Sequence, residues 1–165
     1  MEIEDLITPQ SVIARLRATG KKQVLQELAK RAAEATGLQE RAIFDVLLER
    51  ERLGTTGVGD GIAIPHGKLA ELHRLHGLFA RLETPVDFDA VDDQPVDLIF
   101  LLLAPEGAGA DHLKALARVS RLLRDRSVCE KLRGADKPDA LYALLTESRA
   151  SHAALRGSRP GFNGR

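Results

Sequence analysis

The sequence predicts an α/β fold in which helices cover both faces of a central sheet. Patterns typical of helices and of strands are interleaved along the chain, as they are in layered α/β proteins. The segment Leu98–Leu103 is a continuous apolar run, which is typical of a strand buried on both faces. At 165 residues, the chain is long enough for one domain with its own core and short for two.

Two amphipathic helices are predicted in the first third of the chain. Between residues 21 and 35, apolar side chains recur at helical spacing, with Thr19 as a possible N-cap and Gly37 as the end. A second helix begins near Gln39 and becomes highly charged before it ends at Gly54. Its charged end is therefore expected to lie next to the segment that follows.

That segment is rich in glycine, with four glycines among the eight residues 54–61, and we expect a structured loop there. A short strand at residues 62–64 follows and ends at Pro65, because proline cannot continue a hydrogen-bonded ladder. His66 is then expected just past the end of this strand. Further strands are predicted near residues 12–16, at 77–82 and at 95–104.

Three helices are predicted after the last strand, at residues 111–125, 127–133 and 138–146. The sequence from Ser127 to Glu130 matches a capping box, in which Ser127 is the N-cap of the middle helix. Pro138 suits the first turn of the third helix, because the N–H that proline lacks is not needed there. We expect residues 1–147 to form the domain.

Charge divides the chain into a mildly acidic body and a basic tail. Basic and acidic residues are equal in number, 24 of each, but residues 148–165 contain four arginines and no acid. This tail has few core-forming side chains, so we expect it to be disordered. The overall balance of charge argues against a nucleic acid or an anionic membrane as the partner.

Three features indicate the cytoplasm. The single cysteine, Cys129, excludes an internal disulfide, and the acidic start of the chain lacks the basic and apolar segments of a signal peptide. The longest apolar run, residues 98–104, is far shorter than the roughly 20 residues that span a bilayer. We therefore expect a cytoplasmic protein without membrane insertion.

The glycine-rich segment matches neither of the common nucleotide-binding patterns. A P-loop requires Ser or Thr after its Gly-Lys pair, and Leu69 stands at that position. Gly57, Gly59 and Gly61 alternate with other residues, whereas the dinucleotide fingerprint has the spacing G-x-G-x-x-G. A nucleotide is therefore not predicted.

Histidine both titrates near neutral pH and acts as a nitrogen nucleophile, and the chain has five. His66 follows a strand and the glycine-rich segment, where open α/β sheets place ligand-binding groups, so it is either functional or a structural histidine at a strand end. His112, at the expected start of a helix, either binds phosphate or is a partly exposed helix-start residue. His73 and His76 have only a weak metal-binding spacing.

The segment from Gly59 to Lys68, GDGIAIPHGK, follows LERERLGTTG. Together they resemble the active-site stretch of the enzyme IIA proteins of the bacterial phosphotransferase system. The resemblance is greatest to the nitrogen-regulatory branch, with the fructose and mannitol branch as the nearest relatives, and it covers roughly residues 2–147. It implies a three-layer sandwich with a central mixed β-sheet flanked by helices on both faces.

The resemblance also implies roles for particular residues. His66 matches the histidine that accepts the phosphoryl group, and His112 matches a second active-site histidine that stabilises the phosphate. Arg50 is the best match to a phosphate-binding arginine, with Arg52 as the alternative. The other expected phosphate-binding residues are Thr55, Thr56, Gly57 and Gly67.

The function that the resemblance implies is that of a phosphocarrier. An HPr-type phosphohistidine protein is implied as the donor, with no cofactor and no metal. The main role implied is phosphorylation-dependent regulation of nitrogen- or potassium-related partners, such as potassium-transport or sensor-kinase components. The alternative is a sugar-specific component of the fructose or mannitol type that passes the phosphoryl group to a IIB partner. A zinc-dependent hydrolase using the clustered histidines is a third hypothesis.

Overall fold

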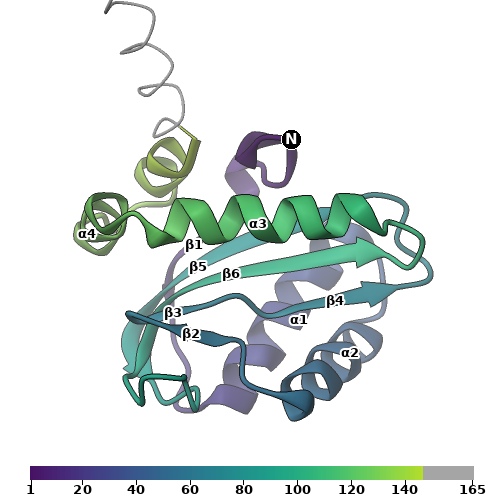
Figure 1. The fold of residues 1–165 in the computed structure, drawn as a ribbon, viewed down its shortest axis with the longest axis horizontal. Helices are drawn as coiled ribbons and strands as arrows, with labels where there is room; N and C mark the ends of the chain where they lie inside the picture. The colour runs from purple at the N-terminus through teal and green to yellow at the C-terminus, as the bar shows by residue number, and fades with distance from the viewer. Residues whose placement is uncertain (147–165) are drawn as a thin grey trace, which may run out of the picture.

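A six-stranded β-sheet forms the centre of the computed structural model, which describes residues 1–146 (Figure 1). The strands are β1 (Val12–Leu16), β2 (Gly57–Gly59), β3 (Ile62–Ala63), β4 (His66–Leu69), β5 (His76–Val86) and β6 (Val96–Pro105). The helices are α1 (Lys21–Thr36), α2 (Glu40–Leu53), α3 (Ala110–Arg124), α4 (Arg126–Gly134) and a last one at 138–146. Two short 3-10 turns, η1 (Ile3–Asp5) and η2 (Pro9–Ser11), precede β1. The tail predicted at residues 148–165 lies outside the described residues.

The sheet is mixed. Its order is β1-β5-β6-β3-β2, and β4 pairs with β6 beyond the end of β3. The pairs β1–β5, β3–β6 and β4–β6 are parallel, whereas β5–β6 and β2–β3 are antiparallel. Figure 1 shows α3 in front of this sheet and α1 and α2 behind it. The predicted three-layer α/β fold is therefore confirmed.

Strand β6 contributes to two hydrophobic cores, because successive side chains of a strand point to opposite faces. The side chains that pack with α1 and α2 are Ile99, Leu101 and Leu103. The side chains that pack with α3 and α4 are Leu98, Phe100 and Leu102. All of them are fully buried, which explains the continuous apolar run in the sequence. Within residues 1–146, no helix is long and apolar enough to cross a membrane.

The predicted start and end of α1 are confirmed, but the predicted N-cap residues of two helices are wrong. Gly37 ends α1 with a φ of 78°, in the left-handed region. Gly20 rather than Thr19 is the N-cap of α1, since the amide and hydroxyl of Thr19 donate to a side chain in the first turn. Asp125 rather than Ser127 caps α4, and its carboxylate accepts from the N–H of Ser127 and of the next residue.

The glycine-rich segment is more regular than predicted. Residues 57–63 form a β-hairpin, in which β2 and β3 are joined by Asp60 and Gly61, rather than a loop. These two residues have positive φ angles of 58° and 80°, as a tight two-residue hairpin turn requires. The strands on either side are too short to produce an alternating apolar pattern.

Pro65 interrupts the edge of the sheet without ending it. Strand β3 stops at Ala63, and pairing with β6 resumes at His66, which lies opposite Leu102. The carbonyl of Pro65 accepts from the N–H of Leu102 at 3.0 Å, so the proline keeps its acceptor role although it has no N–H. His66 therefore lies past the end of β3, as expected, but it is also the first residue of a further strand, β4, that was not predicted.

Candidate functional site

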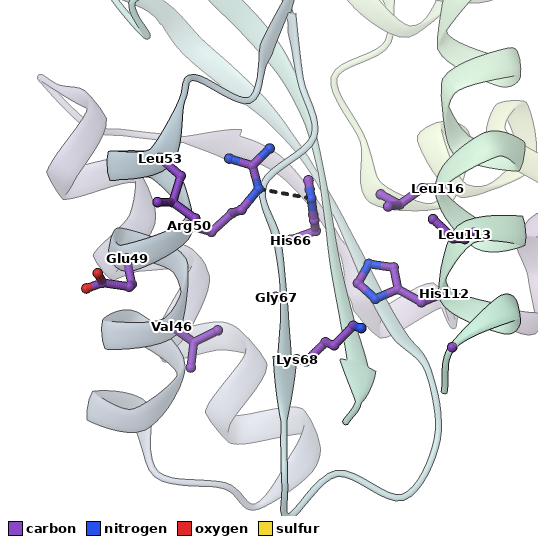
Figure 2. Close-up of a pocket in the computed structure, with 11 residues that line it drawn as sticks. Val46, Glu49, Arg50, Leu53, His66, Gly67, Lys68, His112, Leu113 and Leu116 are labelled. Atoms are coloured by element: carbon purple, nitrogen blue, oxygen red, sulfur yellow. Dashed lines mark hydrogen bonds between the residues drawn. The ribbon is translucent and has the colours of Figure 1, made fainter. Parts of the chain in front are cut away.

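His66 lies at the start of β4, between α2 and α3 (Figure 2). Its Nδ1 is 2.8 Å from the carbonyl oxygen of Ile64, which only accepts hydrogen bonds, so Nδ1 carries the ring proton. In the neutral ring, Nε2 therefore holds the available electron pair. This tautomer makes Nε2 the nucleophilic atom of the residue.

Arg50 approaches His66 from the last turn of α2. Its Nε donates to Nε2 of His66 over 3.3 Å, and its Nη1 donates to the carbonyl oxygen of Gly54 over 2.9 Å. The ion pairs formed within residues 1–146 do not include Arg50. The guanidinium of Arg50 therefore places a positive charge beside the reactive nitrogen. No carboxylate of residues 1–146 forms an ion pair with it.

His112 faces His66 from the first turn of α3. The two rings are arranged edge to face, with centroids 5.8 Å apart and an interplanar angle of 87°. His112 is only 5% exposed, so its interpretation as a partly exposed residue is wrong. Neither ring nitrogen has a hydrogen-bond partner within residues 1–146. A buried polar group left without a partner costs about 1–3 kcal/mol, so folding alone does not explain this histidine.

A cavity of about 590 Å³ lies between α2 and α3 and is lined by all three of these side chains. Figure 2 shows Arg50 and His112 on opposite sides of His66, with Lys68 below them. The rest of the wall is mostly apolar and includes one acid; these residues are Val46, Glu49, Leu53, Gly109, Leu113 and Leu116. Leu53 and Leu113 are 81% and 69% exposed, so they form an apolar rim that is open to solvent.

Both histidines of the cavity favour the neutral form. Burial lowers the pKa of His66 below its ordinary 6.5, and the charge of Arg50 adds to this, although a hydrogen bond to a backbone carbonyl acts in the opposite direction. Burial also lowers the pKa of His112, with smaller contributions from His66 and the charge of Lys68. A neutral imidazole has the electron pair that nucleophilic attack requires.

Three of the expected phosphate-binding residues do not line the cavity. Thr56 donates both its N–H and its hydroxyl to the carboxylate of Glu51, at 2.8 and 2.6 Å. The hydroxyl of Thr55 donates to the carbonyl of Phe88 at 2.7 Å and accepts from the N–H of Gly57 at 3.0 Å. Phosphate binding by these residues requires an exchange of these bonds, and it stays a prediction.

Gly67 lines the cavity, and close packing explains why it is a glycine. A Cβ at this position would overlap Cγ1 of Val46, so α2 approaches β4 where β4 has no side chain. Arg52, the alternative to Arg50, does not line the cavity. Its side chain is 67% exposed, and its Nη1 lies 3.7 Å from Oε2 of Glu49. Residues two positions apart lie about 200° apart around a helix, so only one of these arginines faces the cavity.

Lys68 and Glu51 are charged residues of the site that are not predicted from the sequence. Lys68 lines the cavity, and its position two residues after His66, on the same face of the strand, is a signal that could have indicated it. Glu51 is buried, 7% exposed, although it lies in a run of charged residues. Nothing in such a run distinguishes a buried acid from its exposed neighbours.

The metal-binding hypothesis for His73 and His76 does not fit the structure. His73 is exposed in the connection between β4 and β5, and His76 is the first residue of β5, so they do not share a helical face. Among residues 1–146, no group of three or more His, Cys, Asp or Glu side chains is arranged to hold a metal ion. The cavity instead combines a nucleophilic nitrogen with positively charged donors, which suits the transfer of an anionic group.

The chain is similar to proteins of a phosphotransferase system. Residues 5–148 match the family described as phosphoenolpyruvate-dependent sugar phosphotransferase system, EIIA 2. The chain is 61% identical over 145 residues to a nitrogen regulatory protein of Bradyrhizobium diazoefficiens, covering 88% of this chain and 95% of that protein. It is 39% identical over 149 residues to the nitrogen regulatory protein of Escherichia coli K12, covering 90% and 91%.

Solved structures give the same result. The crystal structure of the nitrogen regulatory protein IIA-Ntr from Neisseria meningitidis has a TM-score of 0.83 and 34% identity, covering 87% of this chain and 99% of that one. The expected resemblance to the nitrogen-regulatory branch is thereby confirmed. The chain belongs to the EIIA 2 family of the phosphotransferase system.

Proposed function

We propose that the chain is a cytoplasmic phosphocarrier, with residues 1–147 as its domain, that accepts a phosphoryl group on Nε2 of His66 from an HPr-type phosphohistidine protein. The contact of 3.3 Å between Nε2 and the guanidinium of Arg50 supports this most directly. An electron pair beside an arginine without a carboxylate partner is suited to an incoming anionic group. The phosphotransfer role of the family supports the same chemistry.

In the proposed step, Nε2 of His66 attacks the phosphorus in line with the bond to the donor's ring nitrogen. The donor P–N bond breaks as the Nε2–P bond forms. The bonding electron pair returns to the donor ring, which leaves as a neutral imidazole when its other nitrogen carries a proton. The proton on Nδ1 of His66 stays in place, and its hydrogen bond to Ile64 stabilises the phosphoimidazolium that forms.

The surrounding side chains stabilise the transferring group. As the phosphoryl group arrives, Arg50 releases the electron pair of His66 and donates to the phosphoryl oxygens instead. His112 supplies an N–H from the opposite wall, and Lys68 adds a second positive charge. Because donor and acceptor are both imidazoles, the transfer is nearly balanced and reversible, and the step uses no cofactor.

The main role that we propose is regulation of nitrogen- or potassium-related partners, such as potassium-transport or sensor-kinase components. The names of the relatives from Bradyrhizobium and Escherichia support this branch. Phosphorylation adds a charge of about −1.5 to −2 at the cavity. Because Leu53 and Leu113 form an exposed apolar rim there, a partner that covers the rim would bind the two states with different affinities.

The test of phosphoryl acceptance is direct labelling of the purified chain. Phosphoenolpyruvate and the enzyme I and HPr homologues of the same organism supply the donor, and the product is analysed by mass spectrometry and phosphorus NMR at alkaline pH, because phosphohistidine is acid-labile. We expect one phosphoryl group on Nε2 of His66. Labelling of another residue, or of none, contradicts the proposal.

The family description itself supports a second function, that of a sugar-specific component which passes the phosphoryl group to a IIB partner. The labelled chain distinguishes the two. On incubation with the IIB proteins of the organism, the label should leave His66 if the sugar-specific function holds and stay there if the chain is a regulator. Binding assays with the phosphorylated and unphosphorylated chain then identify regulated partners by their different affinity.

A further inference from the structure

Glu51 is a buried acid in the last turn of α2. A carboxylate is unfavourable there for two reasons, because burial penalises its charge and the C-terminal end of a helix is itself partly negative. Its partners compensate for this: it accepts from the N–H and hydroxyl of Thr56 and pairs with Nζ of Lys21 at 2.8 Å. Stability alone does not explain the arrangement, since a well-packed apolar residue would avoid both costs.

The partners of Glu51 connect several segments of the chain. Lys21 belongs to the first turn of α1, and its Nζ also lies 3.5 Å from a carboxylate oxygen of Asp89 and 5.1 Å from the ring centre of Phe88. Thr55 reaches the same loop through its hydroxyl, which donates to the carbonyl of Phe88. The turn at residues 54–56 is therefore held between α1, α2 and the loop that follows β5.

This turn also holds Arg50. The carbonyl of Gly54 accepts from Nη1 of Arg50, so the direction in which Nε points toward His66 depends on where that carbonyl lies. We propose that Glu51 fixes the turn through Thr56 and thereby positions Arg50 for the phosphoryl group. Glu51 acts through another residue and is a positioning residue. The inference rests on the proposed acceptance of the phosphoryl group by His66.

The test is a double-mutant cycle on the rate of phosphoryl acceptance from a purified, phosphorylated HPr-type donor. Glu51→Ala should lower the maximal rate about tenfold and leave the KM for the donor unchanged, because a displaced guanidinium stabilises the transferring group less well. Arg50→Ala should lower the rate about a hundredfold. In the Arg50→Ala background, Glu51→Ala should cause no further loss, because the group that it positions is gone.

Two matched variants make the cycle specific. Glu51→Gln keeps an acceptor for the N–H of Thr56, and its NH2 group can donate to the Thr56 hydroxyl, which donates to the carboxylate in the wild type. Its rate should therefore stay within about threefold of the wild type. Glu40→Gln changes an exposed acid at the other end of α2 and should leave the rate unchanged. If Glu51→Ala does not fold, Thr56→Val, which removes only the hydroxyl donor, takes its place in the cycle.

A second readout does not depend on phosphoryl transfer. In the unphosphorylated chain, loss of the Arg50 hydrogen bond should shift the nitrogen NMR signal of His66 Nε2, and Glu51→Ala should reproduce most of the shift caused by Arg50→Ala. An unchanged signal in Glu51→Ala overturns the inference, as does an equal loss of rate in both backgrounds of the cycle. If the wild-type chain is not labelled on His66, the proposed function fails, and the NMR signal alone decides the role of Glu51.

Discussion

Two arginines lie near the strands β3 and β4, and their surroundings are opposite in kind. Arg133 of α4 donates to both carboxylate oxygens of Asp97, at 2.8 and 3.0 Å, and to the carbonyl of Asp60 at 2.7 Å. Among residues 1–146, Arg50 donates only to the carbonyl of Gly54 and to the ring nitrogen of His66. One guanidinium is neutralised within the fold, and the other keeps its charge at a cavity.

The presence or absence of a carboxylate partner distinguishes a charged residue that stabilises the fold from one that is available to a ligand. The hydrogen bond that Arg133 donates to Asp97 raises the pKa of Arg133, as expected for a pair that joins a helix to the sheet. An arginine beside an electron pair and without a carboxylate contributes little to folding, so its position is better explained by a ligand. His112 fits the same rule, because it is buried and has no partner within residues 1–146.

The largest expected effect distinguishes the two histidines of the cavity. His66→Ala removes the accepting nitrogen, so no phosphorylated product should form at any donor concentration. His112→Ala removes only a stabilising donor, so acceptance should persist but be slower by about a hundredfold, or ~3 kcal/mol. Initial rates of labelling measure both variants. Complete loss in both, or labelling of His66→Ala alone, contradicts these roles.

The next largest effect compares the loss of Arg133 with the loss of Arg50, on stability and on the rate of acceptance. Arg133→Ala should lower the free energy of unfolding by about 1–2 kcal/mol, a value reduced because the pair is partly exposed, and leave the rate of acceptance unchanged. Arg50→Ala should slow acceptance about a hundredfold and change the free energy of unfolding by less than about 0.5 kcal/mol. Urea unfolding and labelling rates on the same preparations measure both. If both variants lose the same property, the distinction between the two regions is broken.

Much of the fold is predictable because its helices and its central strand have strong patterns. Apolar periodicity identifies α1, Gly37 marks its end, and the apolar run identifies β6. The N-cap residues are less predictable, because a side-chain oxygen has several possible partners. The amide and hydroxyl of Thr19 instead donate to the side chain of Gln23 in the first turn of α1. Asp125 rather than Ser127 accepts from the first N–H groups of α4.

The hairpin at residues 57–63 is not predictable from the apolar pattern of the sequence. Its turn contains the dipeptide Asp60-Gly61, which is a strong hairpin signal, but β2 and β3 are only three and two residues long and two of their positions are glycines. Tertiary packing explains one of them, since a Cβ on Gly57 would lie 2.9 Å from that of Ala90. A contact between residues so far apart leaves no local trace in the sequence.

The motif around His66 predicts which residue types form the site but not their geometry. The sequence offers both Arg50 and Arg52, and the side of α2 that faces β4 decides between them. That side is set by the close approach at Gly67, which is a tertiary contact. The burial of Glu51 is likewise unpredictable, because it depends on Thr56 and on the start of α1 rather than on its neighbours in the chain.

The smallest expected effect is a pH dependence of stability that arises from buried histidines. Burial lowers the pKa of His66, His76 and His112 below 6.5, the value expected in the unfolded chain. As the pH falls below 6.5, the unfolded chain binds protons that the folded chain does not, so the free energy of unfolding decreases. The full contribution is present only above 6.5. Arg133, whose pKa is raised, stays charged throughout and contributes nothing to this dependence.

Urea unfolding at about pH 7.5 and about pH 5.5 measures the effect, and we expect a lower free energy of unfolding at the lower pH. His112→Ala should reduce the difference, because its buried ring no longer contributes. His73→Ala replaces an exposed histidine and should retain the wild-type difference. If stability is equal or greater at the lower pH, the cavity histidines are not held neutral, and the electron pair that the proposed transfer requires loses its support.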